Sequence, residues 1–355
     1  MRFDSANTRG DRSSLAFGLI LLVSCGGLVG CGKLKSSDPS PLSSPSVANT
    51  SAPTTAEDLA VLQNHSAPIR LVQRTLQRGS DDAQDRGVKI YAAVSADGWK
   101  RAAQVNGGEQ LRMWSTAKAV TATTSLLTAL DEGKPPPSEL AEAMRGAIQR
   151  SENCRQRRVV LWLQEMAGGP AGAADAVRST LSSAGADDVE ISQTAATPDA
   201  ECIDYLNASS AANPLGPSLL LGTAKWTPVA ASTFSLALAA GEFGSAGRSV
   251  YRLMQLPKQR SREQKDPTAY TADVAWGAGK AMDGLKPAYK SGWGGVEQKN
   301  FIAGQIIALR VSGVSYGVAV FGSPDVQPAN DDPGKTAVPA AVEEVLSLLA
   351  PVLAP

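Results

Sequence analysis

The sequence predicts an α+β fold, with one antiparallel sheet built from both ends of the folded region and an all-helical lobe inserted between them. Three observations predict this arrangement. Alternating apolar residues at 88–94 are typical of a strand, and three further strand patterns occur only after residue 285. Most of the intervening residues show helical periodicity. Because two such lobes meet along a cleft, we expect a functional site between them.

The first expected elements are a helix and a hairpin. Apolar residues recur at helical spacing over 57–78, in a helix that Pro68 could interrupt. The strand pattern at 88–94 ends at Asp97-Gly98, a dipeptide that favours a hairpin turn, and a partner strand is expected over 102–105.

A block of helices follows. Residues 114–131 are rich in Ala, Thr and Leu and are followed by Gly133, which predicts a buried helix. Further helices are expected over 137–149, 153–166 and 170–185, and from Thr227-Pro228, where the missing N–H of proline is tolerated.

Three strands and a helix complete the chain. The strands are expected over 286–291, 301–311 and 316–321, and the last two are joined by a turn at Ser312-Gly313. Residues 338–349 are expected to form an amphipathic helix.

Composition excludes several classes of function. The chain has 355 residues, and its 34 basic residues equal its 34 acidic residues, so charge does not attract it to nucleic acid. The single histidine, His65, lies in a polar N-terminal stretch, which argues against a Ser-His-Asp triad and excludes zinc sites that need two histidines. We expect a monomer without metal or other cofactor, whose proton acceptor is not an imidazole.

The N-terminus has the layout of an export signal. Three arginines precede an apolar run at 15–23 that is short for a membrane span. Two cysteines follow, Cys25 and Cys31, in settings that resemble the bacterial lipobox, in which the cysteine is acylated and becomes the mature N-terminus. Cys31 is favoured because Gly30 precedes it and a polar segment follows, whereas Cys25 gives the apolar run a more usual length. An uncleaved anchor is the remaining alternative.

These features divide the chain into a signal peptide (1–31), a Ser/Pro/Thr-rich tether (32–56) and one folded domain (57–355). We expect the domain at the extracytoplasmic face of the cell membrane, held by a lipid anchor. In that oxidising space Cys154 and Cys202 could form a disulfide, and the alternative is two separate thiols.

Ser115 and Lys118 form the only S-x-x-K in the chain, at the expected start of a helix. Residues at this spacing lie on one helix face, about 5 Å apart. A lysine in a cleft gives up its proton more readily, because burial and a second cation both disfavour the ammonium form. Lys118 could therefore act as the base that histidine does not supply, although the motif alone is common by chance.

Two further short motifs follow. Ser151-Glu-Asn153 precedes an expected helix, where the hydroxyl could relay a proton and the carboxamide could orient a substrate. Helix capping is the alternative role for these side chains. Lys290-Ser291-Gly292 ends an expected strand and continues into Trp293-Gly294-Gly295. A lysine beside a glycine on an edge strand could hold a substrate carboxylate and supply the second cation.

In this order, and on these elements, the three motifs resemble those of the penicillin-binding proteins and serine β-lactamases. The similarity to the class A β-lactamase-like group covers roughly residues 57–350 and includes the helical run at 151–185 and the segment that begins at Trp226. The resemblance implies acyl transfer, with β-lactams or D-alanyl cell-wall peptides as substrates.

The resemblance also implies a role for each motif residue. Ser115 would form the acyl-enzyme, Lys118 would accept its proton, and Ser151 would pass a proton to the leaving nitrogen. The oxyanion would lie between the backbone N–H groups of Ser115 and Trp293. The substrate would be bound by Asn153, Lys290, Ser291, Gly292 and Trp293.

Two departures from the family pattern matter. Ser151 follows Ser115 by 36 residues, a shorter spacing than in the familiar β-lactamases, which predicts a more open cleft. The position of the family's deacylating glutamate holds Ile203, and the flanking Glu201 and Asp204 could replace it only if the loop takes another route. The acyl-enzyme is therefore expected to be long-lived.

Three interpretations remain open. The chain could be a membrane-anchored serine hydrolase or acyltransferase of the penicillin-recognising type, a class A-like β-lactamase, or a non-catalytic binding lipoprotein that retains the fold. The sequence favours the first.

Overall fold

The structure is a computed structural model, which describes residues 66–191, 224–256, 277–296, 299–327 and 336–354. All of them belong to one compact unit. The helices are α2 (Ser66–Gln84), η1 (Trp114–Thr116), α3 (Ala117–Asp131), α4 (Ser138–Gln149), α5 (Asn153–Met166), α6 (Pro170–Ser183), α8 (Pro228–Ala240), α9 (Gly244–Gln255), α11 (Ala278–Ala281), η2 (Asp283–Leu285) and α12 (Val338–Leu353). The strands are β1 (Val88–Ala96), β2 (Ala103–Val105), β3 (Leu111–Arg112), β4 (Val189–Glu190), β5 (Lys225–Trp226), β6 (Ala288–Val296), β7 (Lys299–Val311) and β8 (Val314–Pro324). None of these helices combines the length and the apolar composition needed to cross a bilayer.

Five strands form one antiparallel sheet in the order β2-β1-β8-β7-β6. Strand β1 pairs along its whole length with β8, although more than 200 residues separate their sequences. The helices α3 to α9 are inserted between these two parts of the sheet, which confirms the predicted α+β arrangement. Among the described strands, β6 pairs on one side only and therefore lies at the sheet edge.

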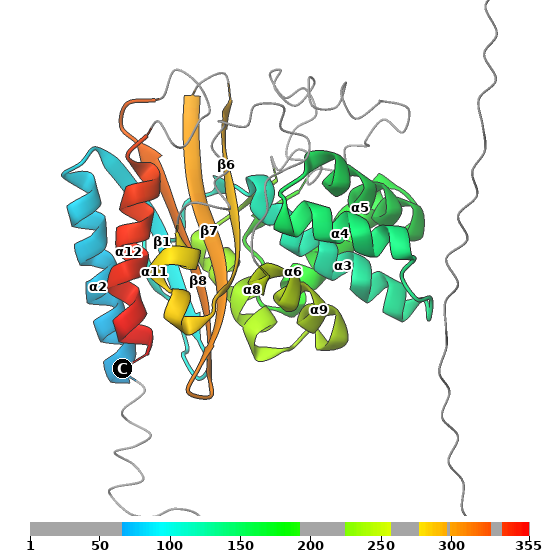
Figure 1. Ribbon diagram of the computed structural model, residues 1–355, viewed down its shortest axis with the longest axis horizontal. Coiled ribbons are helices and arrows are strands. Elements are labelled where there is room, and N and C mark those ends of the chain that lie inside the picture. Colours follow the sequence, from blue (N-terminus) through cyan, green and yellow to red (C-terminus); the bar gives the residue numbers. More distant parts are fainter. Residues whose placement is uncertain (1–65, 192–223, 257–276, 297–298, 328–335, 355) are drawn as a thin grey trace, which may run out of the picture. The chain divides into compact units, whose positions relative to one another are not determined.

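Helices cover both faces of this sheet (Figure 1). Helices α2 and α12 lie side by side on one face, and α8 packs on the other against β1, β7 and β8. Successive residues of β1 face opposite sides of the sheet. Ile90 packs in the cluster beneath α2 and α12, and its neighbour Tyr91 packs in the cluster on the α8 side.

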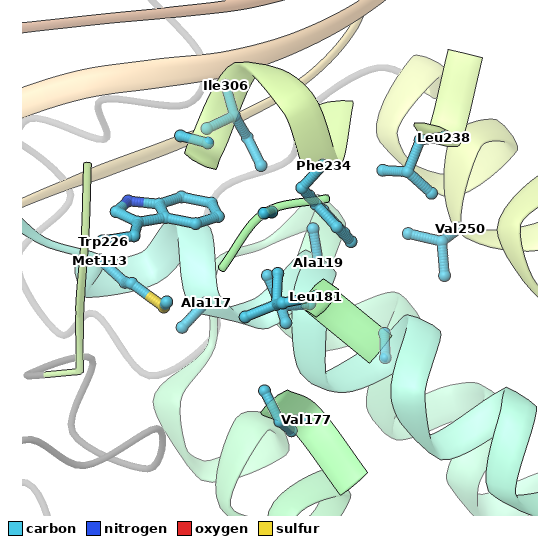
Figure 2. Close-up of a cluster of buried hydrophobic side chains, with 14 of the residues drawn as sticks. Met113, Ala117, Ala119, Val177, Leu181, Trp226, Phe234, Leu238, Val250 and Ile306 are labelled. Carbon is cyan, nitrogen blue, oxygen red and sulfur yellow. The ribbon is translucent and has the colours of Figure 1, made fainter. Parts of the chain in front are cut away.

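The core on the α8 side joins the helical lobe to the sheet (Figure 2). Phe234 of α8, Trp226 of β5 and Ile306 of β7 are all 0% exposed and belong to one cluster. Leu181 of α6 and Val250 of α9 belong to the same cluster, and each such side chain contributes about 1.5–3 kcal/mol through burial. Ala119 and Val120 of α3 belong to the same core, and η1, which leads into α3, packs against β6, the strand that carries K-S-G.

Most of the predicted elements are confirmed. Gly, Pro and Thr residues mark the ends of several of them, as expected from the sequence. Helix α6 begins at Pro170, directly after Gly169, whose φ of 119° suits glycine. The Thr227 side chain caps α8 by accepting a hydrogen bond of 3.1 Å from the amide of Ala230. Ser312 and Gly313, with φ values of 50° and 82°, form the expected tight turn between β7 and β8.

The structure differs from the sequence-based expectations at three points. Pro68 does not interrupt α2, because the helix begins at Ser66 and proline is tolerated in a first turn; the expected helical residues 57–65 lie outside the described residues. Strand β6 continues to Val296, so Lys290-Ser291-Gly292 lies inside the strand rather than at its end. Helices α9 and α11 and the short strands β3, β4 and β5 were not predicted, and strands of two residues carry no periodicity from which to predict them.

Candidate active site

Ser115 lies in the short turn η1 that leads directly into α3. The turn begins at Trp114, which has a positive φ of 44°, and the amide of Thr116 donates to the carbonyl of Met113 at 3.0 Å. Met113 is tied in turn to Ala224, next to β5, by a backbone hydrogen bond of 2.7 Å. Ser115 is half-buried, and its hydroxyl makes no hydrogen bond within the described part of the chain. The amide groups of a helix start point toward this position.

Strand β6 passes in backbone contact with the Ser115 turn. A β-carbon on Gly292 would lie 3.0 Å from the amide nitrogen of Thr116 and 3.1 Å from that of Ser115. A β-carbon on Gly294 would meet the ring of Trp114 at 2.8 Å. Glycines are therefore required on this stretch of β6, because only a backbone without side chains can approach the turn so closely.

The Lys118 side chain is buried, with 3% of its surface exposed, and turns toward the second motif. Its Nζ donates to the backbone carbonyl of Ser151 at 2.6 Å and to Oδ1 of Asn153 at 2.8 Å, and it lies 3.3 Å from Oγ of Ser151. Helix capping is not what these two residues do, because the N-cap of α5 is Glu152 and no side chain caps it. The motif serine and asparagine instead face a lysine.

Lys290 approaches the same serine from β6. This lysine is 0% exposed, and its Nζ donates to Oγ of Ser151 at 3.0 Å and to the carbonyl of Ser291 at 2.8 Å. Because both lysine nitrogens contact one oxygen, they are no more than about 6 Å apart. Burial and mutual repulsion at that distance both oppose two simultaneous ammonium charges. Two buried lysine side chains therefore meet at one serine hydroxyl.

Ser291 and Trp293 alternate with Lys290 and Gly292 along β6, and their side chains lie on the other face of the strand. Ser291 is 0% exposed, and its Oγ accepts a hydrogen bond of 2.8 Å from the amide of Gln305 on β7. The oxygen of the same amide accepts from the backbone of Ala278 at 2.7 Å. The Trp293 side chain packs against the cluster beneath α2 and α12, so any role of Trp293 in the site belongs to its backbone.

Several predicted site residues lie outside the described residues. These are the candidate deacylation carboxylates, the candidate lipidation sites and one cysteine of the expected disulfide: Glu201, Asp204, Cys25, Cys31 and Cys202. Cys154, the second residue of α5, is disulfide-bonded, and the three other cysteines of the chain all fall outside the described ranges. The Cys154–Cys202 pairing stays a prediction. Among the described residues no group of His, Cys, Asp or Glu side chains could hold a metal ion.

Sequence reasoning missed the polar residues that support the motifs. Arg150 and Glu152, on either side of Ser151, form a buried ion pair at 2.8 Å. Gln305 supports the third motif from β7, and Arg112 lies over the Trp114 ring, 5.5 Å from its centroid. Burial lowers the pKa of Arg112 from its ordinary value. One signal was visible in the sequence, where an arginine and a glutamate flank Ser151. Such residues are seldom buried unless they are paired, so burial at these positions implies that the two neighbours form an ion pair.

Comparison with known proteins identifies the fold. No family model matches the chain, and no curated protein matches it. Among solved structures, a variant of the last common ancestor of Gram-negative bacteria class A β-lactamase is 18% identical, with a TM-score of 0.50 over 79% of this chain and 98% of that one. A β-lactamase from Streptosporangium roseum is 14% identical, with a TM-score of 0.51 over 79% of this chain and 98% of that one. A β-lactamase from Desulfarculus baarsii DSM 2075 is 13% identical, with a TM-score of 0.51 over 81% of this chain and 98% of that one. The chain therefore has the fold of the class A β-lactamases.

Proposed function

We propose that the chain is a serine hydrolase or acyltransferase of the penicillin-recognising type, which forms an acyl-enzyme on Ser115 with β-lactams or D-alanyl cell-wall peptides. We place it, by its N-terminal sequence, at the extracytoplasmic face of the membrane on a lipid anchor. The observation that carries the catalytic proposal is the convergence of Lys118 and Lys290 on the hydroxyl of Ser151, beside the Ser115 turn.

The surroundings of Lys118 support it as the base. Its Nζ lies against the carbonyl and the hydroxyl of Ser151 and against Oδ1 of Asn153, and the side chain is 3% exposed. Burial disfavours the charged form of a lysine, and a neutral amine has a lone pair that can take up a proton. Lys290 donates to Oγ of Ser151, and we assign the positive charge of the pair to it.

The reaction follows from these positions. Oγ of Ser115 attacks the substrate carbonyl, and its proton passes to Nζ of Lys118. Collapse of the tetrahedral adduct breaks the carbonyl carbon–nitrogen bond. The leaving nitrogen takes the hydroxyl proton of Ser151, which Lys118 replaces across the 3.3 Å contact. Lys118 is neutral again, and Ser115 carries the acyl group as an ester. The developing oxyanion lies toward the backbone amides of Ser115 and Trp293, and one such donor lowers the barrier by about 3 kcal/mol.

Ser115 is tested with a fluorescent penicillin and intact-protein mass spectrometry. The wild-type chain gains the mass of one penicillin, and S115A gains none. Ser249, an exposed serine of α9, provides the matched control, and S249A labels like the wild type. Labelling of S115A would remove the proposed nucleophile.

The two lysines are separated by arginine substitution. Arginine keeps its positive charge in proteins and cannot act as a base. K118R is therefore expected to lose acylation, whereas K290R keeps the cation and retains labelling at a reduced rate. Equal rates in the two variants would contradict the assignment of the base to Lys118.

The fold of the neighbouring structures favours a class A-like β-lactamase as the second candidate. The two candidates differ in turnover, because an efficient β-lactamase must hydrolyse its acyl-enzyme. The sequence places Ile203 where that family has its deacylating glutamate, so we expect the label to persist for many minutes and a chromogenic cephalosporin to be hydrolysed slowly. Rapid multiple turnover would establish the β-lactamase instead, and absence of any adduct would leave a binding lipoprotein that retains the fold.

A further inference from the structure

A buried ion pair straddles Ser151 at the junction of α4 and α5. Nε of Arg150 lies 2.8 Å from Oε1 of Glu152, and Nη2 lies 3.1 Å from Oε2, so the two groups meet in a two-point fork. Arg150 is 5% exposed and Glu152 is 2% exposed. The hydrogen bond that Arg150 donates to Glu152 raises the pKa of Arg150. The two groups form a buried ion pair across a single residue.

This pair closes a small loop whose backbone is unusual. Ser151 has a φ of 53°, a left-handed conformation that a serine adopts only when its surroundings impose it. The amides of Arg150 and Glu152 both donate to the carbonyl of Gly146, each at 3.2 Å. A β-carbon on Gly146 would lie 2.6 Å from Oε2 of Glu152 and 2.9 Å from Nη2 of Arg150, so the fork lies directly over a glycine.

The backbone conformation of Ser151 determines which of its oxygen atoms face Lys118 and Lys290. Lys118 uses both the carbonyl and the hydroxyl of Ser151, at 2.6 Å and 3.3 Å, and Lys290 uses the hydroxyl at 3.0 Å. These two oxygens face the lysines together only if the backbone of Ser151 holds this conformation. A relaxed backbone at this residue would turn the carbonyl away from Lys118.

We propose that the Arg150–Glu152 pair is a positioning device, which holds Ser151 in its left-handed conformation and so sets the proton path between Lys118, Ser151 and the leaving group. This inference rests on the proposed function for its kinetic consequence. A buried ion pair is a weak source of stability, because the cost of removing two charges from water offsets most of their attraction. Apolar residues of similar volume can replace such a pair without loss of stability, but they cannot form its directional hydrogen bonds.

The decisive variant is the double substitution R150M/E152L, which removes both charges of the fork. Glu142 and Arg155, which lie 3.5 Å from Arg150 and 3.7 Å from Glu152, lose a partner but keep 44% and 28% of their side-chain surface exposed. We expect a melting temperature near that of the wild type and an acylation rate constant about 100-fold lower, the loss that misplacement by about 1 Å produces. R150K keeps the charge but cannot form the fork, and it is expected to lose rate as well. The control is R86M/E344M, which removes an Arg–Glu pair of 2.6 Å that is partly exposed and joins the turn after α2 to α12. The control acylates at the wild-type rate.

A second readout does not depend on catalysis. The ¹³Cε resonance of Lys118, assigned by its loss in K118R, reports the surroundings of the Lys118 amino group. We expect it to shift in R150M/E152L and in R150K and to stay in place in R86M/E344M. If the wild type is never acylated, the proposed function fails, and the resonance alone decides the positioning role. A folded R150M/E152L with an unshifted Lys118 resonance and, where acylation occurs, the wild-type rate would overturn the proposal. If that variant does not fold, R150K decides by the same criteria.

Discussion

Replacement of Gly292 by alanine tests whether β6 and the Ser115 turn must touch through their backbones. The new β-carbon would lie 3.0 Å from the carbonyl oxygen of Met113, 3.0 Å from the amide nitrogen of Thr116 and 3.1 Å from that of Ser115. All three atoms are backbone atoms, so no side chain can rotate out of the way. A comfortable contact of a carbon atom is about 3.5 Å, so the strand and the turn must separate by about half an ångström.

This separation would lengthen a hydrogen bond in the candidate site and would lower the free energy of unfolding. The hydrogen bond from Lys290 to Oγ of Ser151 is 3.0 Å long, and a shift of this size could stretch it to about 3.5 Å, where a hydrogen bond no longer holds. Misplacement by about 1 Å costs about 100-fold in rate, so we expect acylation to fall roughly 10- to 100-fold in G292A. Crowding of a packed interior costs about 1–3 kcal/mol, and we expect the free energy of unfolding to fall by that amount.

The assay combines stopped-flow acylation by a fluorescent penicillin with urea unfolding. Gly284, in η2 shortly before β6, provides the matched control, because a β-carbon there meets nothing within 4 Å. G284A is expected to acylate like the wild type and to be as stable or slightly more so, since alanine restricts the unfolded chain. A G292A variant with unchanged rate and unchanged stability would refute the close backbone contact.

Three further predictions concern the fold and its covalent and pH-dependent stability. Phe234 is 0% exposed in the core that joins the lobes, so F234A should lower the free energy of unfolding by about 3–5 kcal/mol in urea titrations, whereas L71A, at a side chain 44% exposed, should change it by under about 1 kcal/mol. Peptide mapping without reducing agent should recover Cys154 joined to Cys202, and a peptide joining Cys154 to any other partner would exclude that pairing. Burial raises the pKa of Tyr251, so its contribution to stability is complete below the ordinary tyrosine pKa of about 10 and is lost as pH rises through its folded value. Urea titrations from about pH 9 to 11 should therefore show falling stability with a smaller slope in Y251F, and an equal slope would contradict the shifted pKa.

Local signals predicted much of the fold. Helices α4, α5 and α6 lie within a residue or two of their expected bounds, because Pro137 precedes α4 and Gly168-Gly169 separates α5 from α6. Thr227 predicted its helix because a threonine followed by proline satisfies the first amides of a helix. The sequence could not predict β3, β4 and β5, since two-residue strands form only where tertiary contacts bring their chains together. It also underestimated β6, where glycines weaken every strand pattern.

The candidate site also has features that the sequence determines and others that depend on tertiary structure. The sequence by itself determined the types of chemical group present: a serine and a lysine one helical turn apart, a second serine with an asparagine, and a lysine followed by small residues. Spacing fixes such relations because helix and strand geometry is local. Only the tertiary structure decided that Lys290, from a strand 139 residues beyond Ser151, lies within hydrogen-bonding distance of that serine. Packing of the lobes and a buried Arg–Glu pair produce this meeting, and no pattern of neighbouring residues encodes a contact between segments so far apart.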